Sequence, residues 1–199
     1  MQTARDVLYL IMSARTQHGS EPTLYYITFT CYNWLYLFSI TKGYNLIYEW
    51  FDHLKDTAQI KVTAFVIMPN HVHAILFFPT DNYNLTTIIS NAKRFSAYKI
   101  INRLRQSNEN KILQQLEDAL TEREKIKGQL HKVFKDSFDA KPIYTRPFLL
   151  QKIQYIHLNP VRGKWKLVED WREYEHSSAS FYELNKIMHY QPLHYDELY

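Results

Sequence analysis

The chain has 199 residues, which suits one domain with extensions or at most two small domains. Of these residues, 46% are hydrophobic and 22% charged, which argues against general disorder. The single cysteine, Cys31, excludes an internal disulfide framework and a cysteine-cluster metal site, which fits a reducing cytosol. The formal net charge is +4, and the basic residues are clustered: residues 85–105 carry five basic and no acidic side chains, and residues 141–172 carry seven basic and two acidic ones. Such blocks favour a polyanionic partner, with a solvated helix face as the alternative.

The first half of the chain predicts an irregular leader over 1–22 and then a regular series of elements. Aromatic and β-branched residues predict a strand over 24–32, and apolar residues at helical spacing predict a helix over 43–55. Two further strands are predicted over 60–68 and 71–78. Because only Pro69 and Asn70 separate them, we expect these two strands to pair as an antiparallel hairpin.

The second half predicts a helix over 84–105 with a basic outer side, followed by a charged helical insertion over about 106–140. Pro142 and Pro147 indicate a turn, and a last clear helix is predicted over 148–159, where Pro160 ends it. Residues 183–199 predict an acidic C-terminal tail after a main domain over 23–182. No apolar run approaches the roughly 20 residues of a transmembrane helix, so we expect no membrane partner.

The order of these elements predicts an α+β fold. We expect a ferredoxin-like antiparallel sheet with helices packed on one face, together with the charged helical insertion. The pattern does not locate the last edge strand.

The stretch MPNHVHAILFF places His71 and His73 two residues apart at the start of an apolar strand. Alternate residues of a strand share a face, so both imidazoles are predicted to point the same way. Such a pair suits a metal ion: magnesium or manganese if the chemistry concerns phosphate, zinc otherwise. The alternative is one histidine in solvent and one packed in the core.

On the helix predicted over 148–159, the apolar side is formed by Leu149, Leu150, Ile153, Ile156 and His157. Lys152, Tyr155 and Asn159 fall on the opposite side. A tyrosine there can act as a nucleophile if a cation or base helps it to ionise, and Lys152 can supply that charge or hold a phosphate. The alternative is an ordinary interfacial tyrosine.

The basic helix interleaves cations with aromatic residues, which are the two parts of a surface that binds single-stranded nucleic acid. Its aromatic members are Phe95 and Tyr98, and its cations include Lys93, Arg94, Lys99 and Arg103.

Five segments in this order resemble the REP-associated tyrosine transposases, a branch of the HUH single-tyrosine transposases of the IS200-like type. The segments are YYITFTCYN, FVIMPNHVHAILFF, AKRFSAYKI, PFLLQKIQYIHLNPVRGKW and EYEHSSASFY, and they cover most of residues 24–182. The resemblance implies a ferredoxin-like fold and a cytoplasmic, nucleoid-associated bacterial enzyme. It also implies cleavage and rejoining of single-stranded DNA at hairpin-flanked sites, through a 5′-phosphotyrosine intermediate and a Mg²⁺ or Mn²⁺ ion.

The resemblance also implies roles for individual residues: His71, His73 and Asn159 as metal ligands, Tyr155 as nucleophile, and Lys93 and Arg94 as DNA contacts. We add Lys99, Arg103 and Lys152 as expected DNA contacts. The active unit is expected to be a monomer or a homodimer. Two alternatives stay open: a non-catalytic module that binds nucleic-acid hairpins, and a metal-dependent phosphodiesterase that uses water and forms no covalent adduct.

Overall fold

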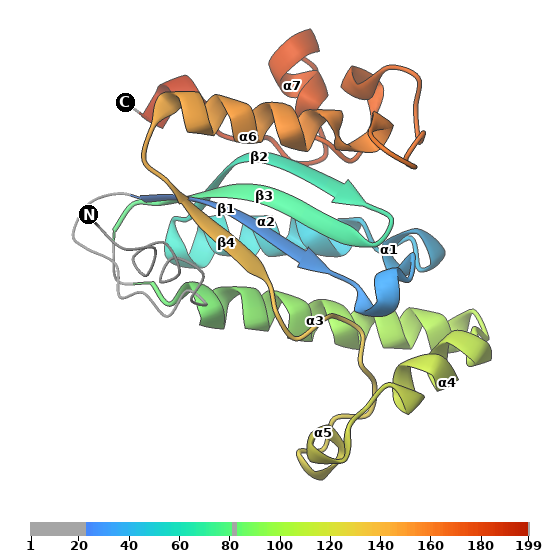
Figure 1. Ribbon diagram of the computed structural model, residues 1–199. Helices are drawn as coiled ribbons and strands as arrows, with labels where there is room; N and C mark the ends of the chain where they lie inside the picture. The colour runs from blue at the N-terminus through green and yellow to red at the C-terminus, as the bar shows by residue number, and fades with distance from the viewer. Residues whose placement is uncertain (1–22, 81–82, 199) are drawn as a thin grey trace, which may run out of the picture.

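The computed structural model describes residues 23–80 and 83–198, so the predicted leader over 1–22 lies outside the described residues. Its centre is a four-stranded antiparallel sheet in the order β2-β3-β1-β4 (Figure 1). The strands are β1 (Thr23–Thr30), β2 (Lys61–Met68), β3 (His71–Phe78) and β4 (Asp139–Ile143). In the β1–β3 pair, Thr23 lies opposite Phe78 and Thr30 lies opposite His71. The α+β class and the antiparallel sheet are confirmed.

Helices cover both faces of this sheet. The helices α2 (Asn45–Ala58) and α3 (Leu85–Gln106) lie on one face, and α6 (Arg146–Leu158) and α7 (Ala179–Leu184) lie on the other (Figure 1). Side chains alternate along each strand, so β1 sends Ile27 and Phe29 to the first core and Tyr26 to the second. The prediction that helices cover only one face of the sheet is therefore wrong, because α6 and α7 cover the face opposite to α2 and α3.

The shorter elements lie in the connections. They are η2 (Tyr32–Trp34), α1 (Leu37–Ile40), α4 (Asn110–Asp118), α5 (Glu122–Ile126), η3 (Asn159–Val161), η4 (Trp171–Glu173) and η5 (Tyr195–Leu198). The insertion predicted over 106–140 contains α4 and α5, which project below α3 in Figure 1. Its last residues belong to β4, and Pro142, which we predicted in a turn, lies within that strand. β4 is an edge strand, where proline is tolerated because the N–H that it lacks is not needed to pair with a second neighbouring strand.

Helix α6 is started by its cap and held by its apolar stripe. Thr145 accepts a hydrogen bond from the backbone N–H of Phe148, and a proline stands in the first turn. The stripe of Leu149, Ile153 and Ile156 is buried against the sheet, whereas Leu150, which we expected on the same side, is 39% exposed.

The C-terminal segment folds back onto the body. Tyr190 is buried in the core against the rings of Phe51 and Phe65, and Asp196 forms an ion pair with Arg146 at the start of α6. Within the described residues, no helix has the length and apolarity needed to cross a membrane.

The packing of α6 on the sheet predicts that two neighbouring leucines contribute differently to the free energy of unfolding. Leu149 is fully buried, so Leu149→Ala is expected to lower the free energy of unfolding by about 2–5 kcal/mol. The control Leu150→Ala is expected to cost less than about 1 kcal/mol because that side chain is largely in solvent. Urea unfolding measures both values, and equal losses would contradict this packing.

His157 predicts a pH dependence of stability. Its Nε2 lies 2.9 Å from Ser178 Oγ, and burial lowers the pKa of His157 from 6.5 to about 3. As the pH falls from 6.5 towards 3, the unfolded chain takes up a proton that the folded protein does not, so the free energy of unfolding falls by about 1.4 kcal/mol per pH unit for this group. Urea unfolding at several pH values is expected to give a shallower dependence for His157→Gln than for the unmodified chain. Parallel curves would refute the assignment.

Candidate active site

The two histidines of the hairpin lie on the α6 face of the sheet. They open β3 on alternate positions, and Val72 between them points to the opposite core. Both side chains are only 5% exposed, and their ring centroids are 4.8 Å apart. The common face that alternation predicts is therefore present, and neither ring lies in solvent.

His71 is oriented by its neighbour Asn70. The Nδ2 of Asn70 donates to the backbone carbonyl of Trp34 at 2.8 Å, so the amide oxygen faces His71 Nδ1 at 2.7 Å. Nδ1 then carries the proton, and Nε2 is left with its lone pair. Burial lowers the pKa of His71 to about 4, and the neighbouring Asn159 side chain, whose amide oxygen favours the protonated ring, raises it in part. The ring is neutral at pH 7, as metal binding requires.

His73 is oriented by two hydroxyl groups from β1. Its Nδ1 lies 2.8 Å from Tyr26 Oη and also within hydrogen-bond distance of Thr28 Oγ1, which donates to Tyr26 Oη. We assign the tautomer in which Nδ1–H donates to the Thr28 hydroxyl, because it leaves Nε2 unprotonated, as metal binding requires. Burial, with the nearby His71 and Lys152, lowers the pKa of His73 well below its usual value. Partners on the second ring nitrogen are the usual way to orient a metal-binding histidine.

Tyr155 lies on the side of α6 that borders these imidazoles. Its ring is 38% exposed, its centroid is 5.4 Å from that of His73, and it meets the Tyr26 ring edge-on at 6.3 Å. Two cations flank it: Lys152 Nζ lies 5.7 Å and the Arg162 guanidinium carbon 5.8 Å from the ring centroid. A solvent-accessible phenol, two cations and two neutral imidazoles thus share one surface site.

Asn159 completes the group from the end of α6. Its φ of −55° and ψ of −41° continue the helical path, so it keeps the side of the helix that the sequence predicts for it. The residue is buried, and its side chain is near enough to His71 to raise the pKa of that imidazole in part. The Asn159 amide therefore lies close to the His71 imidazole, whose Nε2 is free to bind an ion.

The donor set of this site is small and mixed. Within residues 23–80 and 83–198, no group of three or more His, Cys, Asp or Glu side chains is placed to hold a metal ion. Two imidazole nitrogens and one amide oxygen remain, which leaves coordination positions for a phosphate oxygen and water. In each ring, Nδ1 has a hydrogen-bond partner and Nε2 keeps a free lone pair, and such imidazoles suit a divalent ion of borderline softness.

The cations predicted to contact DNA are divided between the two faces of the sheet. Lys152 lies at the site, with its Nζ 4.8 Å from the Tyr26 ring centroid, and burial together with Lys141 lowers its pKa. Helix α3 lies on the opposite face, and three of its four predicted DNA contacts are engaged within the chain. Lys93 donates to the carbonyls of residues 135 and 136, Lys99 pairs with Glu49, and Arg103 donates to the carbonyls of residues 41 and 42.

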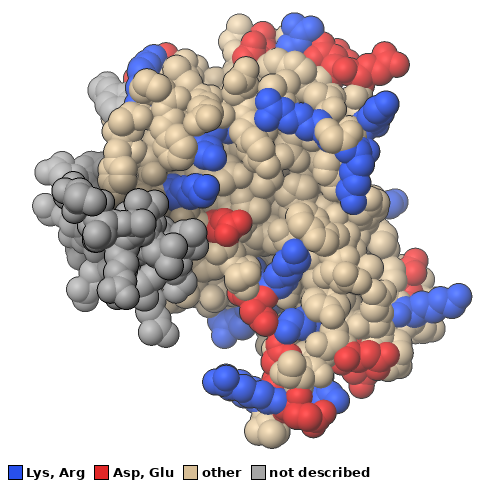
Figure 2. Space-filling view, in the orientation of Figure 1, with Lys and Arg blue, Asp and Glu red and all other residues tan. Residues whose placement is uncertain are grey.

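Of the predicted α3 contacts, Arg94 stays exposed and lies over the Phe95 ring at 5.1 Å. Figure 2 shows Lys and Arg side chains over α6 and the loop after it, where they border an uncharged area of the surface. The cations nearest to Tyr155 therefore come from α6 and the loop after it, and not from the basic helix.

The residues that orient the site, Tyr26, Thr28 and Asn70, and the cation Arg162 are not among the site residues predicted from the sequence. Strand alternation places the two β1 residues on one face, but only the β1–β3 register, which sets Thr28 opposite His73, shows that this face is that of the histidines. Arg162 lies beyond Pro160, outside the predicted helix.

Comparison with known proteins gives a family match and a fold match. A family model described as IS200-like transposase matches residues 36–117, which include both histidines and not Tyr155. No curated protein sequence matches the chain.

Among solved structures, a REP-associated tyrosine transposase bound to a REP hairpin is similar, with a TM-score of 0.53 and 16% identity; the match covers 84% of this chain and 82% of that one. A putative transposase from Deinococcus radiodurans R1 matches with a TM-score of 0.37 and 13% identity, over 73% of this chain and 95% of that one. The resemblance indicated by the motifs is thus confirmed: residues 36–117 match the IS200-like transposase family, and the chain has the fold of a REP-associated tyrosine transposase.

Proposed function

We propose that this protein is a single-stranded DNA transposase in which Tyr155 attacks a scissile phosphate, with residues 23–182 as its catalytic domain. The observation that supports this most directly is the position of an accessible phenol against a buried, neutral histidine pair. A tyrosine placed for packing alone has no need of two flanking cations and an adjoining metal-ligand set. The family match over the histidine segment agrees with this function.

The proposed reaction exchanges one phosphodiester for another. The Oη of Tyr155 forms a bond to phosphorus while the bond from phosphorus to the 3′ oxygen breaks. The phenol proton leaves to solvent, and the departing 3′ oxygen takes up a proton to become a free hydroxyl. The product is a 5′-phosphotyrosine, and attack on it by another 3′-hydroxyl rejoins the strands without an external energy source.

Chain groups prepare this step. Lys152 and Arg162 flank the Tyr155 ring and stabilise the negative charge that the oxygen gains as its proton leaves. Tyr26 and Thr28 hold His73, and Asn70 holds His71, so the Nε2 atoms keep their positions when substrate enters. A Mg²⁺ or Mn²⁺ ion on His71, His73 and Asn159 would polarise a phosphate oxygen and offset its charge. Two imidazole ligands favour Mn²⁺ over Mg²⁺, which prefers oxygen.

The proposed substrate is single-stranded DNA next to a hairpin. The similar solved protein is bound to a REP hairpin, and in this chain the exposed Tyr155 ring is flanked by two cations. We keep Arg94 as a proposed contact because it is exposed beside Phe95. Lys93, Lys99 and Arg103 stay proposed contacts for a longer substrate, which would have to compete with their partners inside the chain.

The nucleophile is tested by Tyr155→Phe. With hairpin-flanked single-stranded DNA and Mn²⁺, the unmodified protein is expected to form an adduct that resists denaturation and migrates as a protein–DNA band. Tyr155→Phe is expected to abolish this band and to retain DNA binding, because only the attacking oxygen is removed. The matched control is Tyr144→Phe, since Tyr144 is 82% exposed and precedes α6.

Two further readouts decide between the proposed function and its alternatives. By calorimetry, Tyr155→Phe is expected to bind Mn²⁺ as the unmodified protein does, and His71→Ala is expected to bind it much more weakly. An adduct that persists in Tyr155→Phe would show that the nucleophile is assigned wrongly. Cleavage without an adduct would identify a water-using phosphodiesterase, and absence of metal binding would identify a non-catalytic DNA-binding module.

The proposed active unit is the monomer, because Tyr155 contacts His73 of its own chain. An equimolar mixture of Tyr155→Phe and His73→Ala is therefore expected to form no more adduct than either variant alone. If the tyrosine helix instead served a partner's histidines, the mixture would contain sites with both groups intact. Recovery of about a quarter or more of the normal adduct in a gel assay would contradict the monomeric site.

A further inference from the structure

Three aromatic side chains surround the outer side of His71. Trp34 and Tyr36 follow β1, and Trp165 comes from the loop after η3. The His71 ring centroid is 5.8 Å from that of Trp34 and 6.0 Å from that of Trp165, and the Tyr36 and Trp165 rings are 5.5 Å apart. We call Trp34, Tyr36 and Trp165 the aromatic platform.

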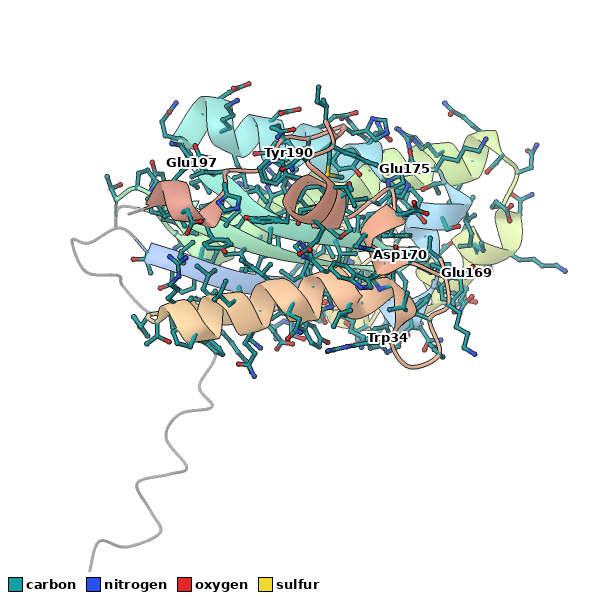
Figure 3. The ribbon with its side chains drawn as sticks, turned by 90° about the horizontal axis from the view of Figure 1, so that it is seen from above. Trp34, Glu169, Asp170, Glu175, Tyr190 and Glu197 are labelled. Carbon is teal, nitrogen blue, oxygen red and sulfur yellow. The ribbon has the colours of Figure 1, made fainter. Side chains whose placement is uncertain are left out.

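Two of the three platform rings are about half exposed, and Trp165 is partly buried against the second core. Trp34 is 48% exposed and Tyr36 is 43% exposed, whereas the His71 ring behind them is buried. Figure 3 shows the labelled Trp34 beside the C-terminal end of α6 and the loop that follows it. Large exposed aromatic rings that adjoin a reactive site are more typical of ligand contact than of core packing.

The position of Trp34 is held by the same residue that orients the metal-ligand candidate. Asn33 and Trp34 have φ values of 47° and 57°, a left-handed conformation that is uncommon for residues other than glycine and unusual for tryptophan. Such a conformation persists only where surrounding contacts fix it, and it is often found at functional sites. Here the carbonyl of Trp34 accepts from Asn70, whose oxygen accepts from His71. The platform and the imidazole therefore have a fixed relation to each other.

Each indole of the platform has a cation beside it. Lys135 Nζ lies 4.3 Å from the Trp34 ring centroid, and Lys164 Nζ lies 5.5 Å from that of Trp165. The backbone N–H of Lys135 donates to the carbonyl of Thr30, which ties this lysine to the end of β1 next to His71. Aromatic faces that stack bases and cations that meet phosphates are the two components of single-strand binding.

We propose that the aromatic platform binds a nucleobase adjacent to the scissile phosphate, with Lys135 and Lys164 contacting the neighbouring phosphates. This inference rests on the proposed function for its substrate and goes beyond it by assigning the residues that position the strand. Trp34 and Trp165 are positioning residues, since they hold the nucleotide while Tyr155 and the imidazoles face its phosphate.

The experiment measures binding without chemistry. A labelled hairpin with a single-stranded flank is titrated in EDTA by fluorescence anisotropy, with Tyr155→Phe as the parent protein. Trp34→Leu and Trp165→Leu keep an apolar side chain against His71 and remove the stacking face, so each is expected to raise the Kd about tenfold. Trp34→Phe and Trp165→Phe retain a ring and are expected to stay within about threefold of the parent.

A second measurement locates the stacked base and controls for folding. Single abasic sites are placed along the flank, and one or two positions are expected to raise the Kd about tenfold for the parent but not for the leucine variants. The control Tyr144→Ala removes an exposed ring at the opposite end of the sheet and is expected to bind as the parent does. Urea unfolding checks that each variant is folded.

The outcomes separate this inference from the proposed function. Leucine variants that bind as the parent does, or phenylalanine variants that lose as much affinity as the leucine ones, would overturn the platform even if the Tyr155 adduct forms. Loss of affinity in the leucine variants alone supports the platform even if the unmodified protein forms no adduct. In that case the proposed chemistry is wrong and the binding surface is still supported.

Discussion

The site depends on the burial of one apolar stripe. Leu149, Ile153 and Ile156 pack on the sheet face that α2 and α3 leave open, and this contact fixes the rotation of α6 about its axis. Because helical residues repeat every 3.6 positions, burying this stripe directs Lys152 and Tyr155 to the border of the sheet, where the histidines lie. The position of the phenol is thus a consequence of hydrophobic packing, which stabilises α6 without any contribution from the reacting groups.

The second constraint is the burial of two neutral imidazoles. A histidine removed from water loses most of its tendency to take up a proton, so His71 and His73 keep free lone pairs at pH 7. Burial alone would leave ring nitrogens without partners. The oxygens of Asn70, Tyr26 and Thr28 supply those partners on the Nδ1 side of each ring and leave Nε2 free for another contact. The same groups therefore stabilise the fold and prepare the site.

The division of cations between the two faces changes how the basic character of the chain is understood. The five basic residues within 85–105 suggest a single binding helix, yet Lys99 and Arg103 are committed to contacts with α2 and the loop before it. The cations nearest to Tyr155 are Lys152 and Arg162, which come from the second basic block. A charge count along the sequence predicts an affinity for polyanions but does not show which charges are free to meet them.

Local patterns in the sequence determined much of this protein. Alternation placed His71 and His73 on one face of a strand, helical periodicity separated Tyr155 from the apolar stripe, and the order of elements predicted the α+β class. These properties follow from the geometry of a single strand or helix, so neighbouring residues are enough to predict them. Only the tertiary structure decided that α6 covers the second face of the sheet, that β4 forms the edge around Pro142, and that Tyr26, Asn70 and Trp34 surround the histidines. Those choices depend on which distant surfaces bury each other, and no local period in the chain encodes that pairing.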